Sequence, residues 1–441
     1  MSQPHARSTA IALAVVILGS VALTGCSGPA ASGVQQELNI VLHDNPPTNK
    51  ALTAMTASFQ KENPNIKVNL NFIPIADWAA TRTARLSAKQ VDITEGVTGP
   101  GATPLPDYVK GAPQSVWMKG VEAGNWVDLS GQKMLDNFIP TVIDALKIEG
   151  KSYQVPTSLN YENGVFYNKE LFAKVGASVP KTWSSFKTVM AKLKEAKITP
   201  LSAGGKDNWP VGLIAIGAAQ SLYPSLAEQQ ALDKGLWANT MKLNNDKNVQ
   251  VLDRVNTIYQ NIDPSFAGVD YSTAEGQFAT GQTAMTVDGT WAASQFLATN
   301  PALKMGFFPL PVSDTASDNK LGGKIDFTFV VASATKHKAA ALKWLDYFSQ
   351  KKNYATFATA GGIIPAQADV QLSPALASVK PYLNGSFDLA WDQVFHANAN
   401  AGSNVGPIGF NYGSLAPVGA LKGAKIAQDA AQSDWAAGLA K

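Results

Sequence analysis

The sequence predicts an α/β protein built from more than one domain-sized unit. Its 441 residues are enough for two or three units at about 150 residues each. Hydrophobic residues make up 45% of the chain and no glycine period appears, which excludes a disordered or collagen-like protein. Segments with a strand pattern alternate with segments of helical apolar spacing, and this alternation is what predicts the α/β class.

The net charge is close to zero. The chain has 36 Lys and Arg against 33 Asp and Glu, a formal charge of +3, and charged residues make up only 16% of it. Because the charges balance and no long basic run occurs, the sequence shows no positively charged region that would bind nucleic acid. We therefore expect no nucleic-acid partner. A surface rich in amides and hydroxyls suits a neutral, polar ligand.

The first residues have the features of an export signal. His5 and Arg7 form a weak basic start, and residues 11–22 are an almost uncharged apolar run of signal-peptide length. The run is too short to span ~30 Å of hydrocarbon as a stable anchor. We therefore expect residues 1–25 to be a signal peptide.

Cys26 is the only cysteine of the chain, so it cannot form an intramolecular disulfide. Residues 23–26, Leu-Thr-Gly-Cys, resemble the bacterial lipobox, in which the thiol is alkylated by diacylglycerol; a chance cysteine is the alternative. We expect a lipid on Cys26, a flexible tether over residues 26–37, and a body held at the extracytoplasmic face of the cell membrane.

The body opens with a strand, a helix and a second strand. Residues 38–42 have the pattern of a short buried strand, which ends at the polar loop 43–47. Apolar residues recur at helical spacing over residues 52–59 until Asn63-Pro64, and they alternate with polar residues over 67–72. Sheets of such units bind ligands at the carboxyl ends of their strands.

Later segments continue the alternation. Residues 183–196 carry an apolar face of helical period, with Thr182 as the predicted N-cap. A similar face over 341–348 begins a helical stretch that Gly361-Gly362 ends. Residues 397–406 have neither period and are expected to be a loop.

Five segments carry short motifs in a recognisable order: 148–156 (IEGKSYQVP), 165–172 (VFYNKELF), 180–183 (PKTW), 278–291 (FATGQTAMTVDGTW) and 361–365 (GGIIP). Together with the lipobox they resemble the extracellular sugar-binding lipoproteins that feed ABC importers, family 1 solute-binding proteins of the maltose-binding type. The resemblance implies a mono- or oligosaccharide ligand, delivery to permease subunits in the membrane, and a monomer without enzymatic activity or cofactor.

The same resemblance implies a periplasmic-binding-protein-like fold, in which two α/β lobes trap the ligand by hinge closure. Crossover strands are expected near residues 157–161, 321–325 and 361–365. Lobe one would contain residues 38–157 and 326–360, and lobe two residues 158–325 and 361–441.

A sugar site pairs flat aromatic rings, which cover C–H faces, with carboxylates and amides that bond hydroxyls. Trp291 is the strongest single expectation, because Gly289, Thr290 and Trp291 are predicted to begin a helix directly after a strand over 283–287, which directs the indole to a strand-end crevice. The alternative is a core tryptophan that braces this helix. Asp288 precedes it, and either accepts from sugar hydroxyls or caps the turn.

Six further residues stand where strands end, at the first crossover or in aromatic and acidic clusters: Asp44, Glu95, Tyr161, Trp209, Trp391 and Asp392. His43, beside Asp44, is better explained as part of a solvated loop. A buried hinge tyrosine is the alternative for Tyr161, and helix packing is the alternative for Trp391 and Asp392.

Catalytic patterns are scarce. The mature chain has only His43, His337 and His396, none in a metalloprotease motif, and no nucleophile elbow or phosphate loop appears. We expect no metal and no catalytic residue. A surface carbohydrate hydrolase remains the enzymatic alternative, because two carboxylates suffice for it, and a binder of another polar solute is the third possibility.

Overall fold

The computed structural model describes residues 35–383 and 388–440. The expected signal peptide, Cys26 and most of the tether lie outside these residues. Gln36–Lys441 form one compact unit. Within the described ranges, no helix is both long enough and apolar enough to cross a membrane.

Lobe one, as we name it, is built on a five-stranded sheet of order β2-β1-β3-β11-β4. Its strands are β1 (Gln36–His43), β2 (Ile66–Ile73), β3 (Ile93–Glu95), β4 (Val155–Pro156) and β11 (Thr328–Val331). β1 pairs in parallel with β2 and β3, and β11 runs antiparallel to β3 and β4. The carboxyl ends of β1 and β3 therefore meet at one edge, which is where ligands of α/β sheets bind.

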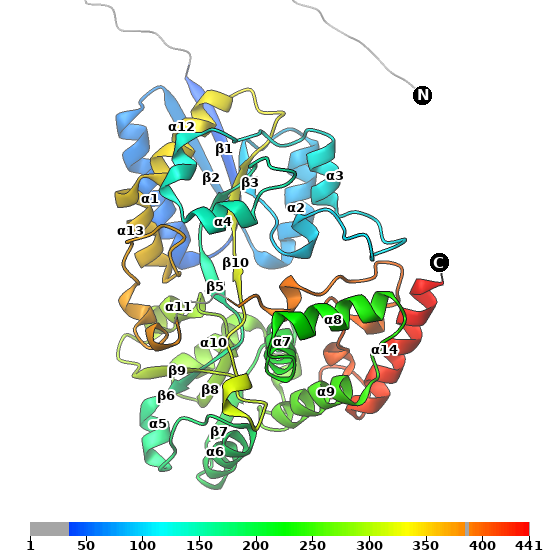
Figure 1. The fold of residues 1–441 in the computed structure, drawn as a ribbon. Coiled ribbons are helices and arrows are strands. Elements are labelled where there is room, and N and C mark those ends of the chain that lie inside the picture. The colour runs from blue at the N-terminus through cyan, green and yellow to red at the C-terminus, as the bar shows by residue number, and fades with distance from the viewer. Residues whose placement is uncertain (1–34, 384–387, 441) are drawn as a thin grey trace, which may run out of the picture. The chain divides into compact units, whose positions relative to one another are not determined.

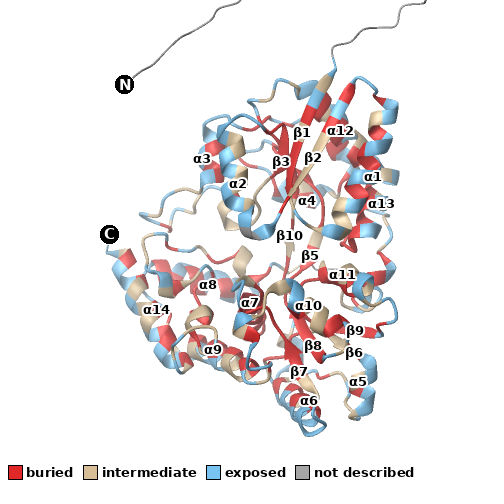
Figure 2. Cartoon of the chain, turned by 180° about the vertical axis from the view of Figure 1, so that it is seen from behind, coloured by how far each residue is buried: buried red, intermediate tan, exposed pale blue. Residues whose placement is uncertain are grey.

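Helices cover both faces of this sheet (Figure 1). On one side lie α1 (Pro46–Glu62), α12 (Lys338–Ser349) and α13 (Lys351–Gly361), and on the other α2 (Ile75–Ser87) and α3 (Val116–Glu122), while α4 (Pro140–Ala145) precedes β4. The core between them contains fully buried aromatic side chains, among them Phe59, Trp344 and Phe348. Figure 2 shows buried residues along the strands and exposed residues on the outer helix faces.

Lobe two is built on a four-stranded sheet of order β7-β8-β6-β9. Its strands are β6 (Gly164–Asn168), β7 (Thr199–Ser202), β8 (Thr283–Asp288) and β9 (Met305–Pro309). Its helices are α5 (Lys169–Lys174), α6 (Trp183–Glu195), α7 (Trp209–Leu222), α8 (Leu226–Trp237), α9 (Asp246–Tyr259), α10 (Tyr271–Ala279), α11 (Ala292–Thr299) and α14 (Ala424–Leu439). β7 and β8 are parallel, so their carboxyl ends also share an edge.

Two short strands connect the lobes. β5 (Leu159–Tyr161) follows β4 and leads to β6, while β10 (Gly323–Ile325) follows β9 and leads back to β11; the two pair antiparallel between the sheets (Figure 1). An isolated bridge from Leu159 to Ile364 adds a third segment to this ribbon. The α/β alternation predicted from the sequence is thus confirmed.

Local signals of the sequence agree with most element ends. Thr182 caps α6 in a reciprocal capping box with Ser185, and Gly362 ends α13 in the left-handed conformation with φ of 63°. One start differs: the helix expected from Gly289 begins at Ala292. The backbone N–H of Thr290 instead donates to the carbonyl of Tyr161 at 2.8 Å, which holds this turn against the crossing strand.

We predict that Thr182→Ala lowers the free energy of unfolding by about 1 kcal/mol, because the first turn of α6 loses its side-chain acceptor. Thr188→Ala is the matched control, since Thr188 is exposed on the same helix and its hydroxyl bonds only the carbonyl of Ser184. Urea unfolding of both variants tests this. Equal midpoints for the two variants would contradict the capping role.

Candidate functional site

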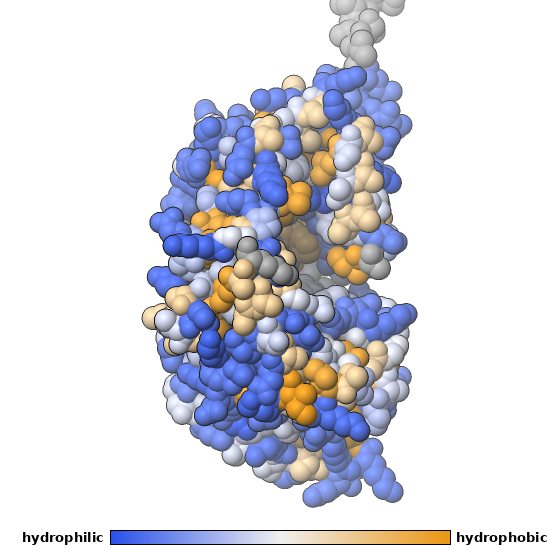
Figure 3. All heavy atoms as spheres, turned by 90° about the vertical axis from the view of Figure 1, so that its right-hand side faces the viewer, coloured by the Kyte–Doolittle hydropathy of each residue, from blue (hydrophilic) through white to orange (hydrophobic). Residues whose placement is uncertain are grey.

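A cavity lies beside the crossing strands, where the two lobes face one another. Residues from lobe one, from the crossing segments and from lobe two line it, including His43, Glu95, Ser158, Asn160, Asp326 and Trp291. The empty space inside it measures about 460 Å³, part of which is open to solvent. Figure 3 shows the surface hollowed between the lobes on one face. This cavity is therefore the candidate site for a ligand held between the lobes.

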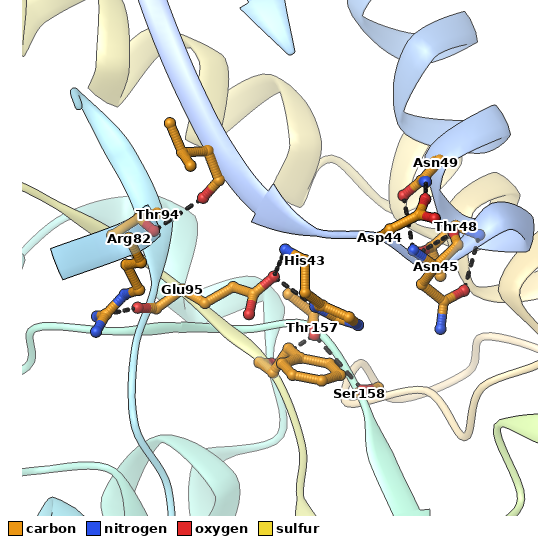
Figure 4. Close-up of polar contacts among 12 residues, drawn as sticks. His43, Asp44, Asn45, Thr48, Asn49, Arg82, Thr94, Glu95, Thr157 and Ser158 are labelled. Carbon is orange, nitrogen blue, oxygen red and sulfur yellow. Dashed lines mark hydrogen bonds and ion pairs between the residues drawn. The ribbon is translucent and has the colours of Figure 1, made fainter. Parts of the chain in front are cut away.

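On the lobe-one wall, His43 and Glu95 are tied together at the ends of β1 and β3 (Figure 4). Nδ1 of His43 lies 2.7 Å from Oε1 of Glu95, and the backbone N–H of His43 donates to the same oxygen at 2.9 Å. The imidazole also lies against the ring of Phe327, with 3.9 Å between centroids. His43 was expected in a solvated loop, but its side chain is only 12% exposed, because the parallel strands bring it against Glu95.

Charge around His43 favours its protonated form. Burial opposes protonation, but the hydrogen bond and charge of Glu95, with the charges of Asp326 and Asp44, outweigh burial and raise the pKa of His43. The strand ends therefore hold the imidazole and the carboxyl group in contact, in surroundings that favour protonation of the imidazole. Such a pair offers a ligand both a donor and an acceptor.

Arg82 of α2 supports Glu95 from behind. Its Nη2 donates to the carbonyl oxygen of Glu95 at 2.6 Å, and its guanidinium lies 6.0 Å from the ring of Trp78 and 5.7 Å from that of Trp126. Burial lowers the pKa of Arg82, against the opposing charge of Glu95. Its Nε is buried and has no hydrogen-bond partner among the described residues.

Asp44 stands at the rim of the same wall. It is exposed, directly after β1 and before α1, and Nδ2 of Asn49 donates to its Oδ1 at 2.5 Å (Figure 4). The N-terminus of α1 favours a negative charge there. Asp44 is thus exposed between the cavity residues His43 and Asn45, but it is not itself among the residues that line the cavity.

The lobe-two wall is aromatic. The indole N–H of Trp291 donates to the hydroxyl of Tyr271 at 3.0 Å, and that hydroxyl donates to Oδ1 of Asp288 at 3.1 Å. The ring of Trp209 lies 4.5 Å from that of Tyr271 and 6.4 Å from that of Trp291. Trp291 is half-buried, so part of its ring remains available to a ligand.

Two acids behind this wall have raised pKa values. Burial, with the charge of Glu275, raises the pKa of Asp288 well above its usual range, although Gly289 and Tyr271 donate to it. Burial raises the pKa of Glu275 to about 7 against a hydrogen bond with Tyr271. Both groups are therefore biased toward the protonated form, in which a carboxyl can donate as well as accept.

A cluster of charged side chains lies at the crossing strands, with Glu162 and Asp326 buried and Lys324 half-buried. The ammonium of Lys324 forms ion pairs with Glu162 and, at 3.7 Å, with Asp326, and it lies 5.4 Å from the centroid of Trp291. Burial raises the pKa of Glu162 to about 8, opposed by the charge of Lys324 and assisted by that of Asp392. The pKa of Lys324 is raised: burial opposes this, but the charges of Glu162, Asp326 and Asp392 outweigh it.

Sequence reasoning missed four residues of this site: Tyr271, Glu275, Lys324 and Asp326. Each is an ordinary polar residue in its local stretch. Only the expected crossover near 321–325 marked the position of Lys324, and it indicated no role for the side chain.

Other expected residues lie farther back. Tyr161 is 5% exposed, in a lobe-two cluster with Phe166. Trp391 is 1% exposed, and its indole donates to the carbonyl of Ile408 at 2.8 Å in the lobe-two core. Asp392 is half-buried and accepts from Gln393 at 2.8 Å. The structure thus brings Glu95 and Trp291 to the cavity, Asp44 to its rim, and Trp209 and Asp288 to the layer behind Trp291.

Among residues 35–383 and 388–440, no three His, Cys, Asp or Glu side chains gather closely enough to hold a metal ion.

The structure is similar to several solved sugar-binding proteins. A solute-binding protein, RafE, in complex with raffinose aligns with a TM-score of 0.73 at 21% identity, covering 90% of this chain and 98% of that one. A chitin oligosaccharide binding protein aligns with a TM-score of 0.70 at 21% identity, over 92% of this chain and 100% of the other. These alignments confirm the two-lobed fold.

Two curated relatives align with this chain over most of its length and most of their own. A multiple sugar-binding protein of Streptococcus mutans serotype c is 25% identical over 349 residues, 76% of this chain and 77% of the relative. An uncharacterized ABC transporter extracellular-binding protein of Pyrococcus horikoshii is 27% identical over 397 residues, 85% and 83% of the two chains. The model of the family described as bacterial extracellular solute-binding protein matches residues 45–355, and the chain belongs to this family.

Proposed function

We propose that this protein captures a carbohydrate between its lobes and delivers it to the permease of an ABC importer. The observation that carries the proposal is the lobe-two wall. There the half-buried indole of Trp291 lines the cavity, and a chain of hydrogen bonds through Tyr271 to Asp288 holds this indole in place. Relatives named for multiple sugars, raffinose and chitin oligosaccharides support the same ligand class.

Each group at the cavity suits one part of a sugar. The indole of Trp291 covers a C–H face, while Glu95, Asp44 and the Lys324 cluster face the hydroxyls with acceptors and donors. Closure then removes water from these polar contacts, which strengthens them. In this proposal the sugar enters an open form, and the lobes close upon it by bending at the crossing strands.

We further propose export, removal of residues 1–25 and lipid attachment at Cys26, so that the body works as a monomer at the extracytoplasmic face of the cell membrane. The lone cysteine directly after the lipobox-like residues supports this. One lipid-bearing end is sufficient to keep the binding protein near its permease.

The ligand test starts with a panel of raffinose, stachyose and chitin oligosaccharides. A stoichiometric thermal shift without any product, checked by chromatography after long incubation, supports capture without reaction. Product formation would favour the hydrolase alternative. A shift with polyamines or peptides and none with sugars would overturn the carbohydrate proposal.

We predict that Trp291→Ala weakens binding of the sugar found in this panel by about 2–4 kcal/mol, or roughly 30- to 1,000-fold, because a largely buried aromatic contact is lost. Calorimetric titration measures this. Trp291→Phe keeps a ring, and we expect it to lose less affinity than Trp291→Ala.

The matched control is Trp435→Phe, since the indole of Trp435 also donates one hydrogen bond, to the carbonyl of Leu236, but deep in the lobe-two core. It should lower the melting temperature while the folded protein keeps its affinity. If Trp291→Ala behaved in the same way, stacking at Trp291 would be excluded.

We predict a pH dependence of stability from Glu275, whose pKa is raised to about 7. The folded state favours its protonated form, so this stabilisation is complete below pH ~4.5 and is lost as the pH rises through about 7. The melting temperature of ligand-free protein should therefore fall between pH 5 and pH 8.5. In Glu275→Gln the fall should be smaller, though not abolished, since the raised pKa values of Asp288 and His43 act in the same direction.

Glu122→Gln serves as the control for Glu275→Gln, because Glu122 is exposed at the end of α3. Its pH profile should match that of the parent. An unaltered profile in Glu275→Gln would show that Glu275 is ionised in the fold throughout this range.

We predict that Cys26→Ser moves the protein from the membrane fraction to the soluble fraction of expressing cells. The body should still fold and bind sugar, because no disulfide can depend on the only cysteine. Ser27→Ala is the control and should remain with the membrane. A Cys26→Ser protein that sediments as firmly as the parent would rule out anchoring by this thiol.

A further inference from the structure

One segment of lobe one packs into lobe two. The chain leaves β3, continues through residues 97–115 and returns to α3, where Ser115 Oγ donates to the carbonyl of Gly101 at 2.6 Å. Between these points Val109 is buried in the lobe-two core, and Leu105, Tyr108 and Ala112 pack against the same core. We call residues 105–112 the interlobe strap. Figures 1 and 2 both show this loop extending from lobe one toward the C-terminal part of lobe two.

A polar lock joins the strap to lobe two. The hydroxyl of Tyr108 donates to Oδ2 of Asp233 on α8 at 2.7 Å. Nδ1 of His396 lies 2.7 Å from the same oxygen, and its backbone N–H donates to Oδ1 at 2.9 Å. Asp233 is 0% exposed, so these donors compensate a carboxylate that water cannot reach.

Two further contacts follow along the strap. Nδ2 of Asn400 donates to the carbonyl of Gly111 at 2.8 Å. Gly99 lies so close to lobe two that a Cβ there would be 2.9 Å from Oε1 of Gln393. Gly99 and Gly111 have φ values of 75° and 78°, a region that favours glycine, so the chain turns at both positions.

The strap is separate from the ligand cavity. None of residues 105–112 lines the cavity at Trp291, nor do Asp233 or His396. The contacts nevertheless join residues of both lobes, and they form only while the lobes are close. They therefore stabilise the closed arrangement relative to an open one, whether or not a ligand is present.

We propose that Tyr108 is a positioning residue which, through Asp233 and His396, holds the lobes closed and sets how long a captured sugar stays bound. The proposal rests on the proposed function for its ligand. Apparent affinity scales with the fraction of protein in the binding-competent state, so loss of the lock weakens binding without removing any contact to sugar. The effect falls mainly on dissociation, because a captured sugar can leave only after the lock has opened.

The test is Tyr108→Phe in the mature protein, compared with Tyr347→Phe. Tyr347 is also half-buried, and its hydroxyl donates to the exposed Glu62 at 3.0 Å, but both residues belong to lobe one. Without sugar, Tyr108→Phe should show a larger radius of gyration by small-angle scattering and faster hydrogen exchange in peptides spanning 105–112 and 393–400. With the sugar identified by the panel, dissociation should be roughly 3- to 30-fold faster. Tyr347→Phe should leave all three measurements at the parent values.

A second variant, Val109→Ala, removes the apolar contact of the strap and should change the same measurements in the same direction. Unchanged scattering and exchange in both strap variants would overturn the proposal, and so would normal dissociation despite a loosened strap. If the ligand-free changes appear but the parent binds no sugar, the strap stands as an interlobe lock and the proposed function fails instead.

Discussion

The hydrogen bonds of Asn160 are the interaction on which the arrangement of the site depends. This side chain is 0% exposed on β5, donates to Asp326 at 2.6 Å and accepts from the hydroxyl of Thr290 at 3.0 Å. One amide thus connects the first crossing strand to the end of the second and to the turn that carries Trp291. A buried amide has few alternative partners, so its satisfied network specifies one geometry.

That connection determines which charges meet. Lys324 on β10 lies near Asp326 of the same segment, and the pairing of β5 with β10 brings it to Glu162, close to the indole of Trp291. Removing charges from water is costly, and the mutual attraction of the cluster offsets this only while its geometry is kept. The paired strands β5 and β10 therefore connect the two lobes and also hold the charged side chains beside the cavity.

The parts of this architecture that depend on neighbouring residues were predictable from sequence. Thr182 marks the start of α6 because it is a local N-cap, and the turn after β8 brings Trp291 to a strand end, as expected. Tyr271 and Lys324 could not be predicted, because their roles depend on contacts between segments far apart in the chain. His43 was misjudged for the same reason: only the pairing of β1 with β3 places it against Glu95.

The helix α7 has a consequence for how the chain reaches this state. Nearly all of its 14 residues are buried, and the core that covers it includes segments near the C-terminus, where Trp435 of α14 lies 5.2 Å from the ring of Trp237. A helix that is apolar on every side cannot remain solvated without partners. Lobe two therefore cannot finish folding until α14 has been synthesised. Until then α7 exposes apolar side chains that only a late contact between distant parts of the chain can cover.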